Sequence, residues 1–404
     1  MSSDSPFEWL SGGLFFGKKG GIESIDSCKD VMTLITGIDQ NLKGICVKLR
    51  GPKVDESGGP TAASNPQKQE NDKPSTSAED ILAARLARLR FLLYDERRIS
   101  SQQDSRKSTP AVASATVQAL TGNDLSHLIP RLLDNLSILP FESRKNVASI
   151  FNYLLVCGLE GNDAAMYQPI MNSFRDYVGS SFDEIMSTLV KGHDCTAGKS
   201  PDCCLHFGSM VRSCLRHVSL YRELCSSTER AERYVFPFLE KYVHLPNFDM
   251  SSDAMETLRV IFTGEEDKHV NEEQQQQMAE LAAHLLTRDY EAIWIERFNP
   301  LLLTEKANYM TRRMALQILS TVLLTRSNYA VMVKYVAERN NLILVMKLLR
   351  DTSLHITLDA FHVFKIFVAN PNKPPEIVKI LKDNSVKLCR YLETLHKDRE
   401  ETDT

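Results

Sequence analysis

The sequence predicts an all-α protein: a right-handed α-solenoid whose helical repeats stack around a concave groove. Three observations support this fold class. One pattern of apolar residues recurs five times, at intervals that each have room for three helices. Sustained alternation of apolar and polar residues is scarce, and the Asn-Gly and Asp-Gly turns of β-hairpins are absent. The composition, 43% hydrophobic and 25% charged, is ordinary for a protein that buries a core.

The pattern is clearest in residues 359–375, which read DAFHVFKIFVANPNKPP. Its apolar residues lie at i, i+1, i+4, i+7 and i+8, which is one face of a helix: Ala360, Phe361, Phe364, Phe367 and Val368. Pro371 disfavours the α conformation at Asn370, so we expect the helix to end there. Pro374 and Pro375 suit the first turn of another helix, which points to a short turn between two stacked units.

Four earlier segments match the same template: Val147, Ala148, Phe151, Leu154, Leu155; Cys203, Cys204, Phe207, Met210, Val211; Ala254, Met255, Leu258, Ile261, Phe262; and Ala315, Leu316, Leu319, Val322, Leu323. The first residues of successive matches are 56, 51, 61 and 45 residues apart, close to the armadillo and HEAT period with insertions. A generic helical bundle could match the same template and is the alternative fold. In the solenoid, the third helix of each unit would line the groove.

Composition divides the chain into four parts. Residues 51–79 are rich in Gly, Pro, Ser and charge and lack large apolar residues, so they predict a disordered insert. The polar stretches 96–110 and 192–202 indicate loops between helices. We therefore expect an N-terminal part with a first helix, the insert, a helical-repeat domain and an acidic tail: 1–50, 51–79, 80–395 and 396–404.

Several bulk features bear on the location of the protein. No run of eighteen apolar residues is present, which argues against a membrane span. The first twenty residues lack the basic and long apolar regions of a signal peptide. The nine cysteines have no regular spacing, which favours reduced thiols. We therefore expect a cytoplasmic protein.

The charge is unevenly distributed along the chain. Residues 301–399 contain 16 Lys and Arg against 8 Asp and Glu, whereas residues 1–300 contain 32 against 41. The C-terminal quarter therefore carries a positive field that favours acidic partners. The alternative is a set of solvated helix surfaces with no partner. A nucleic-acid site would interleave aromatic residues with dense Lys and Arg on one face, but here the aromatics fall in the apolar stripes.

Motifs of catalysis and metal binding are missing. The sequence has no phosphate-binding glycine loop, no H-E-x-x-H and no kinase H-R-D or D-F-G, which predicts a protein that is not an enzyme and needs no cofactor. The densest cluster of potential metal ligands lacks the paired Cys spacing of zinc sites: His193, Cys195, Cys203, Cys204, His206 and Cys214. Because Cys203 and Cys204 are adjacent at apolar template positions, core packing is the better interpretation. His362 belongs to the polar face of its helix.

Residues 348–373, LLRDTSLHITLDAFHVFKIFVANPNK, closely resemble the calcium-binding protein 39 family, also called the mouse-protein-25-like scaffold family. This family includes fungal members such as the conidiophore development protein hymA. Further similar segments occur in the same order: LFFGKK (14–19), LPFESRKNVASIFNYLL (139–155), VRSCLRH (211–217), FDMSSDAMETLRVIF (248–262) and NYMTRRMALQILSTVLLTRSNYAVMVKYV (308–336). The resemblance implies an armadillo-like scaffold that binds a sterile-twenty class kinase or pseudokinase in its groove and favours the active conformation. It also implies a C-terminal pocket for a short Trp-Glu-Phe type peptide.

The resemblance assigns partner-binding roles to seven residues: Arg313, Arg326, Tyr329, Met346, Arg350, Lys365 and Lys387. In the family pattern a Phe stands at Tyr329, while Gln317 and Asp383 replace lysines. Asp383 would weaken a pocket for an acidic peptide. We expect a protein that is monomeric alone, binds a kinase of signalling or morphogenesis, and binds no metal, nucleic acid or membrane. An adaptor that tethers partners without activating them is the alternative function.

Overall fold

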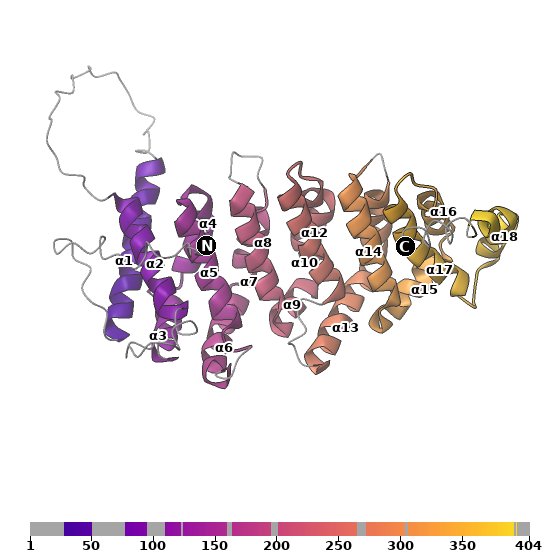
Figure 1. Cartoon of the computed structure of the whole chain (residues 1–404). Helices are drawn as coiled ribbons and strands as arrows, with labels where there is room; N and C mark the ends of the chain where they lie inside the picture. The colour runs from indigo at the N-terminus through magenta and orange to yellow at the C-terminus, as the bar shows by residue number, and fades with distance from the viewer. Residues whose placement is uncertain are drawn as a thin grey trace, which may run out of the picture.

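The computed structural model describes residues 28–50, 77–94, 110–122, 124–159, 164–194, 201–264, 272–303, 306–391 and 393. Every regular element in these ranges is a helix (Figure 1). The LFFGKK segment, residues 51–76 of the expected insert, Cys195 and the acidic tail lie outside the described ranges. The second helix begins at Ala78, two residues earlier than the expected start of the repeat domain.

Two helices open the described chain, α1 (Cys28–Arg50) and α2 (Ala78–Tyr94), and five units of three helical segments follow. The first segments of the units are α3 (Pro110–Thr121), α6 (Ala164–Ser180), α9 (Val218–Cys225), α13 (Glu272–Arg288) and α15 (Tyr329–Ala337). The second are α4 (Leu128–Asp134), α7 (Phe182–Lys191), α10 (Thr228–Tyr234) with α11 (Phe236–Glu240), the π-helix η5 (Glu291–Phe298) with η6 (Asn299–Leu302), and α16 (Arg339–Leu348).

The third helices are α5 (Phe141–Val156), α8 (Pro201–Leu215), α12 (Phe248–Thr263), α14 (Tyr309–Leu324) and α17 (Leu354–Ala369). The short 3₁₀ segments η3 (Leu136–Ile138), η4 (Tyr242–His244) and η7 (Arg326–Asn328) join neighbouring helices, and α18 (Pro375–Asp383) follows the fifth unit. These five third helices are the five segments that match the apolar template.

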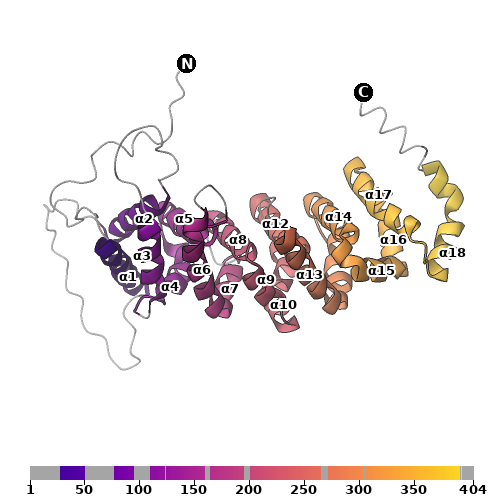
Figure 2. The same cartoon turned by 90° about the horizontal axis from the view of Figure 1, so that it is seen from below.

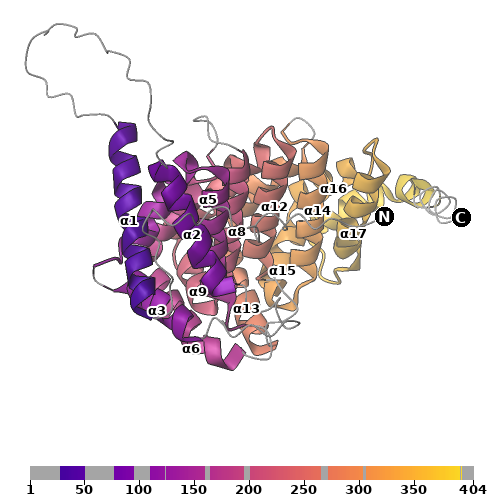
Figure 3. The same cartoon turned by 60° about the vertical axis from the view of Figure 1, so that its left-hand side comes forward.

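Helices in the same position of successive units pack against each other. The third helices form one continuous row that begins with α2 and runs through α5, α8, α12, α14 and α17, which we call the ladder. The first helices form a second row from α3 to α15. Figure 2 shows the resulting rod bowed toward the ladder, so that the ladder lines its inner side. Figure 3 shows α1 beside α2 and α3 at the N-terminal end. The predicted α-solenoid of three-helix units is confirmed.

Burial of the template residues explains why the units stack. All five template positions of α5, α8, α12 and α14 are buried. In α17 the prediction is wrong at two positions, because Phe361 is only half-buried and Val368 is 47% exposed. Val363 is buried instead. The physical reason is that α17 ends the ladder: α18, the next helix, packs mainly against α16, so the far face of α17 stays uncovered.

Polar contacts accompany the apolar packing between ladder helices. In four of the five template segments the residue directly before the first template position is Asp or Asn, and an arginine of the preceding ladder helix donates to it. The pairs are Arg90–Asn146 (3.3 Å), Arg144–Asp202 (2.9 Å), Arg212–Asp253 (2.7 Å) and Arg313–Asp359 (3.4 Å). Each pair fixes the register of two adjacent helices.

The ends of the helices follow their local sequence. Asn370 caps the end of α17 with a φ of −57° and a ψ of 117°, the extended conformation that the following proline favours. Pro374 and Pro375 start α18, as predicted. Gly264 ends α12 at a φ of 69°, a left-handed conformation that favours glycine.

The cysteines differ in part from expectation. Cys46, Cys157, Cys203, Cys214, Cys225 and Cys389 are free thiols. Cys204 is disulfide-bonded, so the expectation of reduced thiols is wrong at this position. Among the helices in the described ranges, none is long and apolar enough to cross a membrane.

Candidate functional site

The candidate site lies on the outward side of α14. This helix begins at an Asn308 cap, whose side-chain oxygen accepts from the backbone N–H of Thr311 at 2.9 Å. Its template residues pack into the core, so the residues between them point away from the core. We call the outward set the α14 face: Arg313, Gln317, Ser320, Thr321 and Leu324.

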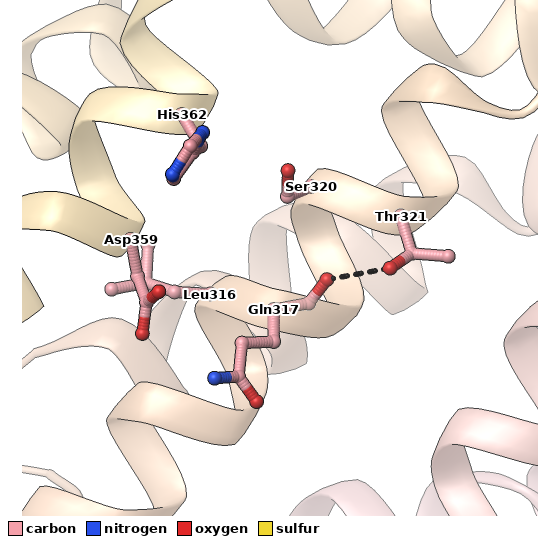
Figure 4. Close-up of a pocket in the computed structure, with 6 residues that line it drawn as sticks. All are labelled: Leu316, Gln317, Ser320, Thr321, Asp359 and His362. Carbon is pink, nitrogen blue, oxygen red and sulfur yellow. Dashed lines mark hydrogen bonds between the residues drawn. The ribbon is translucent and has the colours of Figure 1, made fainter. Parts of the chain in front are cut away.

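A hollow of about 220 Å³ separates the middle of the α14 face from α17. Its lining consists of Leu316, Gln317, Ser320 and Thr321 from α14 and Asp359 and His362 from α17 (Figure 4). The Thr321 hydroxyl donates to the main-chain oxygen of Gln317 at 3.0 Å, so its proton is engaged within α14. Binding pockets for small molecules usually enclose about 300–1,000 Å³, so this hollow suits a single side chain better than a cofactor.

One carboxylate dominates the charge of the hollow. The Asp359 carboxylate accepts from Nε of Arg313 at 3.4 Å, a long contact for a charged pair. The two other ionisable or amide side chains of the lining, His362 and Gln317, are exposed. The hollow therefore presents one negative charge, with an arginine at its edge.

A buried ion pair holds α14 against the turn that precedes α17. Arg312 donates to Asp351 at 2.5 Å, and the backbone N–H of Ser353 donates to the same carboxylate at 2.9 Å. Burial alone would raise the pKa of Asp351, but these two donors outweigh it and hold the pKa below its usual value. This ion pair therefore connects the first turn of α14 to the turn that leads into α17, the two helices that form the hollow.

A patch of apolar side chains continues the α14 face at the corner with α15. Leu324 is 68% exposed, Tyr329 65% and Val333 42%. Tyr329 and Val333 are one helical turn apart on α15, and the exposed Arg326 lies between Leu324 and Tyr329 in the chain. We call these four residues the corner patch. Clustered exposed apolar residues of this kind mark interaction surfaces in soluble proteins.

The structure divides the seven predicted site residues into two groups. Arg313 lies near the start of α14, Arg326 begins the 3₁₀ segment η7 and Tyr329 begins α15, and the last two belong to the corner patch. The other four lie toward the C-terminal end of the rod, with Arg350 in the turn after α16 and Lys387 beyond the end of α18. Met346 is half-buried against the core, Arg350 and Lys387 are exposed, and Lys365 is exposed with its ammonium 5.3 Å from the centre of the Phe361 ring.

None of the seven predicted residues lines the hollow, so sequence reasoning missed its lining. The signal was present, because Asp359 directly precedes a template segment, and Gln317 and His362 follow the second template position of theirs. These are the positions that the template turns outward. What the sequence alone could not supply was that α14 and α17 leave a gap there.

Four members of the cysteine and histidine cluster belong to the core, and His206 is half-buried. His193, Cys203, Cys204 and Cys214 are buried, as predicted for core packing, and the His193 ring packs against those of Phe238 and Tyr242. Within the described residues, no group of three His, Cys, Asp or Glu side chains is placed to hold a metal ion.

Comparisons with known proteins give a consistent result. The family model described as Mo25-like matches residues 60–404. The degreening-related gene dee76 protein of Auxenochlorella protothecoides is 34% identical over 81% of this chain and 88% of its own. Human calcium-binding protein 39-like is 31% identical over 82% and 84%. The conidiophore development protein hymA of Emericella nidulans is 29% identical over 82% of each chain.

Proposed function

The chain belongs to the Mo25-like family, and from this we propose that it is a non-catalytic scaffold that binds a sterile-twenty class kinase or pseudokinase and favours the active conformation of that partner. The observation that carries the proposal is the corner patch. Three exposed apolar side chains beside an arginine have the composition of an interface centre, where aromatic residues and arginine are enriched.

The α14 face extends this surface along the inner side of the rod. A kinase lobe seated there would contact the corner patch at one end of α14 and Arg313 at the other. Arg313 and Leu324, the corner-patch residue on α14, are eleven residues apart, or about 16 Å at 1.5 Å per residue. Contacts at both ends would fix the orientation of a folded domain, which a single patch could not do.

Activation would follow from preference for one conformation. A kinase that exchanges between inactive and active arrangements is shifted by any protein that binds the active one more tightly. A preference of about 1.4 kcal/mol changes the ratio tenfold. The stacked helices are suited to this role, because the ladder is packed along its length and three of its five helix-to-helix steps carry an arginine–aspartate pair, which resists deformation by the partner.

We assign the second group of predicted residues a separate role at the end of the rod. Met346 would pack against an aromatic side chain of a short C-terminal peptide, and Arg350 and Lys387 would attract its carboxylates. Lys365 would add to the same positive surface. The exposed Asp383 at the end of α18 opposes an acidic peptide, so this contact is the weaker of the two. We further propose that the protein acts in the cytoplasm, as a monomer.

A kinase assay tests the proposal. The phosphorylation rate of a purified sterile-twenty class kinase is measured with and without the full chain, and then with Arg326→Ala and Tyr329→Ala. We expect stimulation by the unaltered chain and a loss of about tenfold in stimulating affinity for each variant, because central interface residues of these types contribute about 1–2 kcal/mol. Met166→Ala and Arg233→Ala remove an equally exposed apolar residue and an exposed arginine from other helices and should leave stimulation unchanged.

If both corner-patch variants stimulate the kinase as strongly as the unaltered chain, the corner patch does not take part in activation. If the kinase binds the chain with no change in phosphorylation rate, the function is that of a tethering adaptor, and the activation part of the proposal is wrong.

A further inference from the structure

The hollow between α14 and α17 is built to accept hydrogen bonds. Its polar lining offers the Asp359 carboxylate, the Gln317 amide oxygen, the Ser320 hydroxyl and the ring of His362. In Figure 4 Asp359 and His362 border it from α17, and Ser320 and Gln317 border it from α14. Acceptors on both walls, with one negative charge among them, suit a guest that donates several hydrogen bonds at once.

The resident arginine satisfies only part of this carboxylate. Nε of Arg313 reaches one oxygen of Asp359, Oδ2, at 3.4 Å, and Arg313 is not part of the lining. A well-formed pair between arginine and carboxylate has contacts of about 2.7–2.9 Å and engages both oxygens. The two other arginine–aspartate pairs of the ladder fall within this range, Arg144–Asp202 at 2.9 Å and Arg212–Asp253 at 2.7 Å. Asp359 therefore keeps the capacity to bind a second cation.

We propose that this hollow receives a basic side chain of the bound partner, an arginine in preference to a lysine. The planar guanidinium can donate to the free oxygen of Asp359 and, from its other nitrogens, to Gln317 and Ser320. This inference rests on the proposed function, because it places the side chain of a partner in the groove of the scaffold. The C-terminal quarter is positively charged overall and favours acidic partners. The hollow is a local negative site within it, so it would select partners that carry a basic side chain at this position.

Substitutions at position 317 should change the affinity for a cationic guest in opposite directions. Gln317 is exposed, so its replacement should not disturb the fold. Gln317→Lys places an ammonium of the protein itself in the hollow and should exclude a cationic guest, whereas Gln317→Glu adds a second carboxylate and should attract it. Asp359→Asn removes the existing charge. Asp176→Asn removes an exposed carboxylate from α6, far along the rod, and is the matched control.

The probe is a short capped peptide, Gly-Ser-Arg-Ser-Gly, titrated to millimolar concentration against the full chain and followed by methyl NMR at Leu316, which lines the hollow. We expect the Leu316 signals to shift with the arginine peptide and not with its uncharged citrulline analogue. The dissociation constant should rise about fivefold in Gln317→Lys and in Asp359→Asn and fall about fivefold in Gln317→Glu. Asp176→Asn should match the unaltered chain.

Two outcomes would overturn the inference: no shift at Leu316 with the arginine peptide, or equal shifts with the arginine and citrulline peptides. A stronger shift with a lysine peptide would overturn the preference for arginine. Because this readout needs no kinase, its failure is distinct from the failure of the proposed function, which is judged by phosphorylation rate in the corner-patch variants.

Discussion

His217 is a buried polar residue whose protonation affects stability. It lies in the turn between α8 and α9, and its Nε2 is 2.6 Å from the main-chain oxygen of Leu155 on α5. Burial lowers the pKa of His217 to about 4, although the bond to Leu155 opposes this change. Burial likewise lowers the pKa of His193 to about 4. Both rings are therefore neutral in the folded protein at physiological pH.

These histidines predict how stability depends on pH. Below pH 6.5 the unfolded chain binds protons at these rings before the folded protein does, so the free energy of unfolding falls as the pH drops from about 6.5 to about 4. Each ring contributes a slope of up to about 1.4 kcal/mol per pH unit. Urea unfolding at pH 7, 6 and 5 measures the slope, and His217→Gln should reduce it. An unchanged slope in the variant would contradict the account, whatever its absolute stability.

Pairs of helices depend on contacts that the apolar pattern does not reveal. Between α8 and α12, Arg212 donates to Asp253 at 2.7 Å and to the Thr257 hydroxyl at 2.8 Å. A Cβ at Gly208 would lie 1.8 Å from Oδ2 of the same aspartate, so the two helices approach closely where the ion pair forms. The Asp253 carboxylate therefore lies between the Arg212 guanidinium and the backbone of Gly208.

Removing this aspartate tests the ion pair between helices. Asp253→Ala would leave the largely buried Arg212 without its carboxylate, and we expect a loss of about 3 kcal/mol in the free energy of unfolding, measured by urea denaturation. Glu229→Ala breaks an exposed pair with Arg233 and should cost less than about 1 kcal/mol. Equal losses in the two variants would show that the α8–α12 pair has no special structural role.

At this same scale the sequence predicts helices better than it predicts their exposed faces. The proline pattern after Val368 correctly predicts where α17 ends and α18 begins, because proline restricts its own backbone and that of the preceding residue. The apolar template correctly predicts the buried face of every ladder helix that has a neighbour on each side. It fails at Phe361 and Val368 because burial there depends on whether another ladder helix follows, which local sequence does not encode.

The arrangement of the whole molecule could be predicted in part. The repeat interval predicts three-helix units, and like helices of successive units do stack in rows. The family resemblance assigns partner binding to Arg313, Arg326 and Tyr329, and that assignment stays a prediction. The hollow beside Arg313 could not be predicted, since its walls come from helices about 40 residues apart and its existence depends on how far apart they pack.

We propose that the ladder side of the rod at α14, together with the α14–α15 corner, binds the partner, and that the rest of the row of first helices does not. Hydrogen exchange of the full chain, alone and with a sterile-twenty class kinase of the proposed partner class, tests this claim most directly. We predict slower exchange on binding in peptides from α14 and the α14–α15 corner, with no change in α6 of the outer row. Protection of α6 with none at α14 or the corner would contradict the account.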